Sequence, residues 1–136
     1  MDVDIILNDT VYEKEVIHLY SLNQWSAAEK PKELLLALRN SHTLITARFK
    51  GELVGIANAI SDGYLVVYYP HILVLPKYQG QGIGKEIMHC MQNKYKNFHQ
   101  QMLTADEKAI HFYKSLGFKS AGNTQSMWIY QGNEHS

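Results

Sequence analysis

The segment that most limits how this chain can fold runs from Val74 to Lys85, where a strand-like stretch leads through closely spaced glycines into a helix-like one. Those glycines are Gly80, Gly82 and Gly84. Glycine lets successive backbone N–H groups turn toward one concave spot, because no side chain blocks the approach. The start of the next helix adds unpaired donors and the positive end of its dipole. The segment predicts an anion site suited to a pyrophosphate; the alternative is a glycine-rich turn that holds no ligand.

Two other phosphate-binding loops fit this segment less well. In a Walker loop a serine or threonine follows the Gly-Lys pair, but here Glu86 stands in that position, and Gln79 replaces the first glycine. A dinucleotide-binding loop requires a glycine three residues after Gly82, and that residue is Lys85. The spacing therefore favours a different kind of phosphate cradle.

The charge balance argues against a nucleic-acid partner. The 136 residues include 13 basic and 13 acidic side chains, whereas polyanion binders gather an excess of Lys and Arg. Apolar residues make up 46% and charged residues 19%, which suits one packed domain over residues 1–136. No run is long enough to suggest a membrane span. The single cysteine, Cys90, cannot form an internal disulfide, and the acidic N-terminus is unlike a signal peptide, so we expect a cytoplasmic protein.

The first half of the chain predicts a strand, two helices and then three strands. The first strand covers residues 3–7. Thr10 and Glu13 have the spacing of a capping box, so the first helix is expected to begin at Thr10. Pro31 suits the first turn of the second helix. The three strands are expected at 43–49, 53–60 and 64–75, with a bulge where Pro70 cannot donate a ladder hydrogen bond.

The second half predicts two helices and three short strands. Hydrophobic periodicity and turn residues place helices at 82–96 and 109–116, a strand at 101–104, and two closing strands at 118–121 and 126–130. This order of elements predicts an α+β fold, with a mixed, mainly antiparallel sheet and helices on its faces.

Two motifs resemble those of the GCN5-related N-acetyltransferases. The family's motif A reads Gln/Arg-x-x-Gly-x-Gly/Ala, which Gln79, Gly82 and Gly84 fill. Its motif B commonly reads Phe-Tyr, three residues, then Gly-Phe, and residues 112–118 match it. The motifs stand in the family's order, and the expected elements follow the family's order along nearly the whole chain. The resemblance implies the acyl-CoA N-acyltransferase fold.

The resemblance also implies an activity and its site. Acetyl-CoA would be the cosubstrate and an amine the acceptor, with no metal. Backbone groups of Ile72, Leu73 and Val74 would pair with the pantetheine arm, and Tyr113 would protonate the departing thiolate. The amides that would hold the pyrophosphate belong to Gly80, Gln81, Gly82, Ile83, Gly84 and Lys85, after Gln79. Asp106 stands where the family usually has an Asn; an ionised carboxylate cannot donate a hydrogen bond, so that cofactor contact departs from the pattern.

Acetyl transfer to an amine needs a proton acceptor and a proton donor. Free alkylamines are mostly protonated near pH 7 and must lose a proton before they attack. His71, just before the cofactor strand, is a candidate base, because a neutral imidazole works near pH 7; a chain of water molecules is the alternative. Tyr113 could instead be a packing residue, and His71 a surface or bulge residue. Cys90, inside the long helix, is expected to be an inert buried thiol.

The acceptor is expected to be a small primary amine, and a protein amine is the alternative. An acceptor pocket is expected to draw on aromatic residues among Tyr12, Tyr20, Trp25, Tyr68 and Tyr69, which could equally be core residues. The apolar end at 127–130 predicts a homodimer, because small domains often close exposed strands in symmetric pairs. The rival functions are an acyl-CoA-binding domain without turnover and an interaction domain with a vestigial site.

Overall fold

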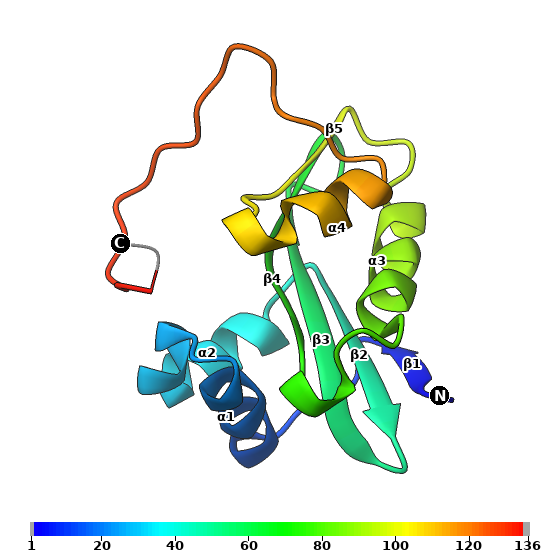
Figure 1. Ribbon diagram of the computed structural model, residues 1–136, viewed down its shortest axis with the longest axis vertical. Coiled ribbons are helices and arrows are strands. Elements are labelled where there is room, and N and C mark those ends of the chain that lie inside the picture. The colour runs from blue at the N-terminus through cyan, green and yellow to red at the C-terminus, as the bar shows by residue number, and fades with distance from the viewer. Residues whose placement is uncertain (1, 135–136) are drawn as a thin grey trace.

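A computed structural model describes residues 2–134, and it contains a five-stranded sheet with helices on both faces (Figure 1). The strands lie side by side in chain order: β1 (Asp4–Leu7), β2 (Thr43–Phe49), β3 (Glu52–Ser61), β4 (Val66–Val74) and β5 (Gln100–Met102). The first four are antiparallel to their neighbours, and β5 is parallel to β4. The mainly antiparallel mixed sheet predicted from the sequence is confirmed.

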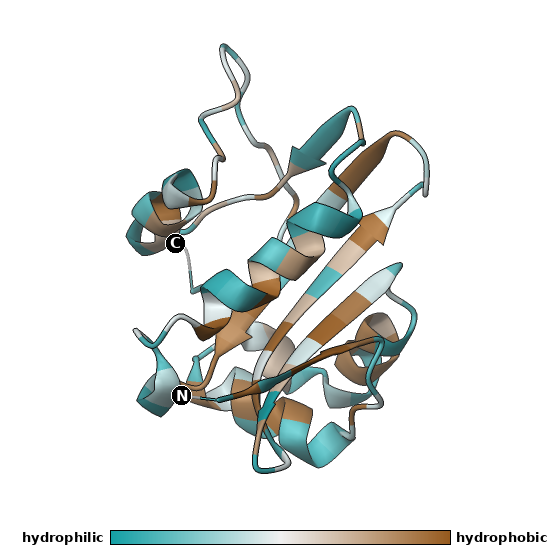
Figure 2. Cartoon of the chain, turned by 90° about the vertical axis from the view of Figure 1, so that its right-hand side faces the viewer, coloured by the Kyte–Doolittle hydropathy of each residue, from teal (hydrophilic) through white to brown (hydrophobic). Residues whose placement is uncertain are grey.

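The helices flank this sheet. They are α1 (Glu13–Leu22), α2 (Pro31–Arg39), α3 (Ile83–Lys94) and α4 (Ile110–Ser115), with short 3₁₀ turns η1 (Ser26–Glu29), η2 (Pro76–Tyr78) and η3 (Glu107–Ala109). Figure 2 shows the apolar residues gathered in the strands and on parts of the helices, as expected of amphipathic helices that cover a sheet. None of the helices in residues 2–134 is long and apolar enough to cross a bilayer.

The apolar stripes of the helices form the core against the sheet. On α1, Val16, Leu19 and Tyr20 are buried, and on α3 the residues four apart, Ile83, Ile87 and Met91, are buried as well. These stripes follow the helical period, which brings residues three and four apart to one side.

The first helix begins two residues later than the capping-box prediction placed it. Tyr12 is the N-cap, and its backbone N–H donates to Glu15 at 3.1 Å, so Thr10 with Glu13 as the capping pair is wrong. The Thr10 carbonyl instead accepts a hydrogen bond from Arg48 at 3.2 Å. A tertiary contact has therefore displaced a local capping motif of similar sequence spacing.

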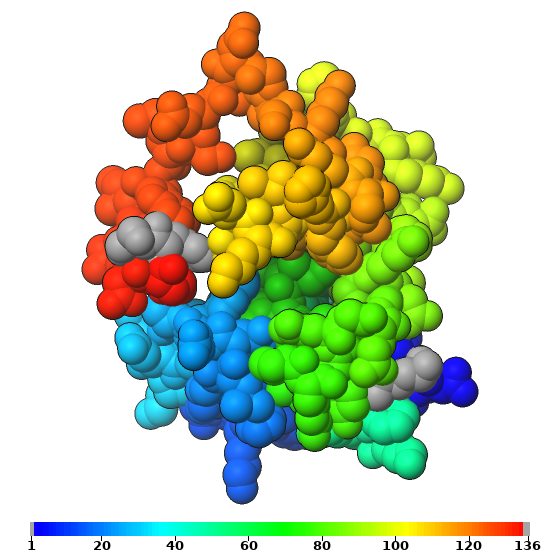
Figure 3. Space-filling model, viewed as in Figure 1, coloured from blue at the N-terminus to red at the C-terminus, as the bar shows by residue number. Residues whose placement is uncertain are grey.

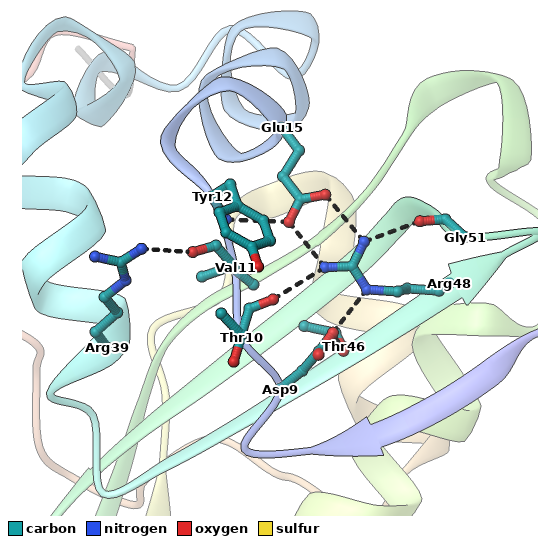
Figure 4. A network of polar contacts seen from close by, with 9 residues as sticks. All are labelled: Asp9, Thr10, Val11, Tyr12, Glu15, Arg39, Thr46, Arg48 and Gly51. Carbon is teal, nitrogen blue, oxygen red and sulfur yellow. Dashed lines mark hydrogen bonds and ion pairs between the residues drawn. The ribbon is translucent and has the colours of Figure 1, made fainter.

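Arg48 joins the first helix to the β2–β3 hairpin (Figure 4). Its guanidinium donates to Asp9 at 2.7 Å and forms a bidentate ion pair with Glu15, with hydrogen bonds of 2.8 and 2.9 Å. It also donates to the Gly51 carbonyl in the hairpin turn at 3.0 Å. Burial raises the pKa of Asp9, but hydrogen bonds from Arg48 and Thr46 and the charge of Arg48 outweigh it, so that the pKa lies below its ordinary value. The network fixes where α1 starts relative to the sheet.

A bulge at Pro70 divides β4 into two parts, as the proline predicted. Asn58 pairs with His71 and Ile60 with Tyr68, so Ala59 alone opposes two residues of β4. The extra residue reverses the alternation of side chains. The Tyr69 ring meets the ring of Tyr95, which follows α3, whereas His71, two residues later, meets α1.

The two closing strands predicted at 118–121 and 126–130 are wrong. The segment after α4 pairs with none of the five strands in residues 2–134; it stands away from the sheet and returns toward α1 and α2 (Figure 1). There Ser26 donates to the Glu134 carboxylate at 2.9 Å, and Tyr130 donates to it at 2.6 Å. The pattern of apolar and turn residues predicted strands here, but a strand also requires a neighbour, which that pattern does not specify.

Candidate functional site

The glycine loop forms a concave turn at the start of α3. Gly80 and Gly82 have φ angles of 80° and 86°, a left-handed conformation that residues with a Cβ rarely adopt. A Cβ added at either glycine would meet no atom within 4 Å, so the loop leaves open space beside them. Gly82 is the N-cap of α3, without a side-chain cap, and the first helical bond runs from Glu86 N–H to its carbonyl at 3.0 Å.

The backbone at this turn is equipped to hold an anion. The N–H groups of Gly82, Ile83, Gly84 and Lys85 precede the first helical hydrogen bond, so they have no acceptor inside α3. They lie at the positive end of a helix dipole. Gly82 is exposed, and so are the side chains of Lys85 and Gln81, which leaves the turn accessible to a ligand. These are the features of a phosphate cradle.

The second part of β4 has an open edge that leads into this turn. β5 pairs with β4 only from Val66 to Tyr68, and no other strand in residues 2–134 takes over beyond that point. Leu75 N–H donates to the Val54 carbonyl in β3 at 2.8 Å. Because the bonding direction alternates along an antiparallel pair, the backbone N–H and C=O of Leu73 point toward β3 as well. The N–H and C=O groups of Ile72 and Val74 therefore point to the open edge.

Two side-chain amides meet the Val74 carbonyl on that edge. Asn23, at the end of α1, donates to it at 3.2 Å, and Gln79 donates to it at 3.0 Å. Gln79 also donates to the Asn23 side-chain oxygen at 3.2 Å. The Gln79 side chain thus ties the start of the glycine loop to the end of β4. Sequence reasoning missed Asn23, because an Asn at a helix end is ordinary and nothing nearby indicated its distant partner.

Helix α4 brings Tyr113 toward the start of α3. A Cβ on Gly84 would lie 3.4 Å from the Phe112 ring, so the small residue allows α4 to pack closely there. Tyr113 is buried against the rings of Phe112 and Phe118, with centroids 5.1 and 6.0 Å away. Burial raises its pKa to about 12. The phenol therefore keeps its proton at neutral pH.

His71 lies in an aromatic cluster on the α1 side of β4. Its Nδ1 is 2.7 Å from the Tyr20 hydroxyl, and its ring meets the edge of Trp25 at 5.1 Å between centroids. Burial lowers its pKa to about 4, so the imidazole is neutral at pH 7. His71 is thus a half-buried residue with defined partners, beside the open edge.

The remaining predicted positions are scattered. Asp106 is exposed, and its carbonyl accepts from Ala109 at 2.8 Å in the turn before α4. Cys90 is exposed on α3, so the prediction of a buried thiol is wrong, because Cys90 lies off the helix's apolar stripe.

The aromatic set does not form one pocket: Tyr12 and Tyr68 are exposed, while Tyr20 and Tyr69 are buried in the core. Residues 2–134 contain no cluster of three side chains suited to a metal ion.

One cavity adjoins the aromatic cluster through Trp25. It has a volume of about 270 Å³ and is lined by Ser21, Gln24, Trp25, Ser26, Ala28, Glu29, Asn133 and Glu134. Trp25, which lines this cavity, also contacts the ring of His71 on β4. A second cavity, of about 440 Å³, lies between α1 and the hairpin; Tyr12 lines it, but none of the predicted catalytic or cofactor-binding residues does.

Known proteins share this sequence pattern and fold. The profile of the "Acetyltransferase (GNAT) domain" matches residues 8–128. An uncharacterized N-acetyltransferase of Porphyra purpurea is 30% identical over 139 residues, which cover 93% of this chain and 78% of that protein. A GNAT family acetyltransferase structure from Streptococcus pneumoniae TIGR4 superposes with a TM-score of 0.82 at 29% identity, covering 96% of this chain and all of the other. An aminoglycoside N-acetyltransferase in complex with CoA shares the fold, with a TM-score of 0.70 at 17% identity over 96% of this chain and 95% of its own.

Proposed function

The chain belongs to the GNAT acetyltransferase family, and from that premise we propose that it moves the acetyl group of acetyl-CoA directly to a primary amine of a small molecule. The observation that carries this proposal is the continuity of two backbone surfaces. The open edge of β4 at Ile72 and Val74 leads directly into the donors at Gly82 to Lys85. Such an edge suits the amides of a pantetheine arm, as an added strand would. The donors suit the pyrophosphate that follows it.

The residues around the edge divide the chemistry of transfer. A new N–C bond forms as the C–S bond breaks, the amine gives up a proton, and the thiolate takes one. The Val74 N–H, which points to the open edge, would stabilise the charge that develops on the carbonyl oxygen. Tyr113 holds its proton at neutral pH and would supply it to the leaving thiolate.

The proton that the acceptor amine loses is not assigned to a single strong base. With a pKa of about 4, His71 is neutral at pH 7 but is a weak base. We propose that it accepts the proton only as one member of a relay that includes water, with Tyr20 fixing its ring through the 2.7 Å hydrogen bond. The cavity beside Trp25 is the proposed place for the body of the amine, because Trp25 both lines it and contacts His71. We propose that Asp106 contacts the nucleotide through its backbone and not through its carboxylate.

Two further expectations belong to this proposal. The protein acts in the cytoplasm, and two copies of it associate as a homodimer. The apolar segment at 127–130 supports association, since three of its residues expose more than half of their surface.

The test of the proposed function is thiol release from acetyl-CoA with a panel of small amines and, separately, a lysine-containing peptide. We expect CoA to appear only with an amine present and the acetylated amine to appear in equal amount. Direct transfer predicts no acetylated protein in the absence of acceptor, which intact-mass measurement checks. Binding of acetyl-CoA without release for any amine would favour the alternative, an acyl-CoA-binding domain without turnover. Absence of binding would favour a vestigial interaction domain.

A further inference from the structure

The Val74 carbonyl, on the open edge of β4, already has two hydrogen-bond donors. The side-chain amides of Asn23 and Gln79 donate to it at 3.2 and 3.0 Å. A carbonyl oxygen has two lone pairs, so the two amides use its full capacity. An added strand bonds to both the N–H and the C=O of an edge residue. A pantetheine arm can therefore bond to this carbonyl only where one of the two amides gives way.

The two amides differ in how firmly they are held. Gln79 is exposed, so water can replace its hydrogen bonds at little cost. Asn23 is half-buried, and its amide also donates to the Leu19 carbonyl at the end of α1, at 3.0 Å. Moving Asn23 would leave that helix-end carbonyl without this donor. Asn23 is therefore the fixed donor at Val74, and Gln79 is the exchangeable one.

A comparison with the next helix shows which bonds of Asn23 go beyond a local cap. Asn40 ends α2 as Asn23 ends α1, and each side chain donates to the carbonyl four residues earlier, at 2.8 and 3.0 Å. Asn23 adds bonds to distant segments, because its amide reaches Val74 and its oxygen accepts from Gln79 at 3.2 Å. Figure 3 shows α1, in blue, beside the green segment that leads into α3. These added bonds connect α1 to the proposed cofactor edge.

On its other side, Asn23 leads to the proposed acceptor cavity. Trp25 follows two residues later, and its N–H donates to the Tyr20 carbonyl at 3.1 Å. The rings of Tyr20 and Trp25 both contact His71, and Trp25 lines the cavity. The position of these two rings relative to Val74 thus depends on how the end of α1 is held.

We propose that Asn23 is a positioning residue for acetyl transfer, which sets the distance between the acceptor amine beside Trp25 and the thioester on the edge of β4. Its amide stays on the Val74 carbonyl, while Gln79 gives up its bond there to an amide of the pantetheine arm. The end of α1 then keeps its place against the edge when the cofactor binds. This role rests on the proposed function, since it places both substrates where that function does.

Asn23→Ala tests this role, with Asn40→Ala as the matched control. Each variant loses the same cap at a helix end, so we expect similar small decreases in melting temperature. Asn23→Ala alone should lower kcat with the best amine, by about 10²-fold, the cost of a misplacement near 1 Å. The KM for the amine should change far less than kcat. The acetyl-CoA dissociation constant, measured by calorimetry, should change by less than about threefold, because the donors of the glycine loop are intact.

Asn23→Asp separates hydrogen-bond donation from packing. An ionised carboxylate has nearly the same shape but cannot donate to Val74 or Leu19, so kcat should fall as it does in Asn23→Ala. A kcat of both Asn23 variants within about threefold of that of Asn40→Ala would reduce Asn23 to a local cap and overturn the proposal. Wild-type protein that releases no CoA with any amine overturns the proposed function, and this role with it. Turnover by the wild type therefore shows which of the two has failed.

Discussion

Burial has opposite effects on the two titratable side chains of the proposed site. It raises the pKa of Tyr113 to about 12 and lowers that of His71 to about 4, because a charge is disfavoured away from water in both cases. Both side chains are therefore neutral at pH 7. One retains a proton that it can donate, and the other has a nitrogen that can accept a hydrogen bond. The motif predicted Tyr113 as a donor, but no sequence pattern indicated the surroundings that set either pKa.

Tyr113→Phe tests the proposed acid. The ring packing against Phe112 and Phe118 should survive, so acetyl-CoA affinity and melting temperature should change little. Turnover with the best amine should fall by about 10²–10⁴-fold, the range of a lost general acid. Tyr64→Phe, at an exposed tyrosine, is the control and should retain full turnover. A loss of stability without a loss of kcat would mean that Tyr113 is a packing residue.

His71 predicts a pH dependence of stability. Its folded pKa of about 4 lies below the ordinary value of 6.5, so the unfolded chain binds more protons between these values. The free energy of unfolding should rise with pH across that window by up to about 1.4 kcal/mol per pH unit, and this contribution should be lost as pH falls toward 4. His71→Gln should remove that part of the slope in urea unfolding, whereas His18→Gln, at an exposed site, should not. An unchanged slope in His71→Gln would show that His71 titrates normally.

Single elements in this protein serve more than one purpose, and β4 is the clearest example. Its first part pairs with β5, and its second part has the open edge where we propose that a ligand pairs with Ile72 and Val74. The sequence located β4 well, because Gly63 and Pro76 stand at the two ends of an apolar run and Pro70 marked the bulge. The same kind of signal failed after α4, since alternation indicates a strand but not its neighbour. It also failed at Thr10, because the Thr10 carbonyl accepts a hydrogen bond from Arg48 on β2.

Gly82→Asp tests the cradle at the junction of η2 and α3. The carboxylate would enter the space where phosphate is proposed to lie, and the φ of 86° is unfavourable for any side chain by roughly 1–2 kcal/mol. We expect calorimetry to detect no acetyl-CoA binding by the folded variant. Gly51→Asp is a matched control, because Gly51 also has a φ of 85° and open space around it but lies in the hairpin turn. Equal affinity in both variants would place the phosphates elsewhere.

At the scale of the whole molecule, the proposed site joins elements from most of the chain. Asn23 from α1, Val74 from β4, Gly84 from α3 and Phe112 from α4 all border the same edge or turn. The pairing of these elements could be anticipated from family order, but their contacts could not, since a distance such as that from Asn23 to Val74 depends on how α1 ends. A ligand that binds this junction should stabilise the entire fold.

Acetyl-CoA should therefore raise the melting temperature. At a concentration of 100 times its dissociation constant it would stabilise the folded state by about 2.7 kcal/mol, which for a domain of this size is roughly 5–10 °C. Differential scanning fluorimetry measures the shift, and Gly82→Asp should abolish it while Gly51→Asp should not. A wild-type melting temperature that does not respond would argue that the cradle is vestigial.

The bulge at Pro70 makes β4 a strand with two phases. Up to Tyr69 the odd-numbered side chains face α3, and from His71 onward they face α1. Deleting one residue there would restore a single phase. It would then turn either the Tyr69 ring or the His71 cluster to the wrong face, although every remaining residue would keep its chemistry. The spacing between Tyr68 and Val74 is thus a length constraint, which tolerates many substitutions but not a change in the number of residues.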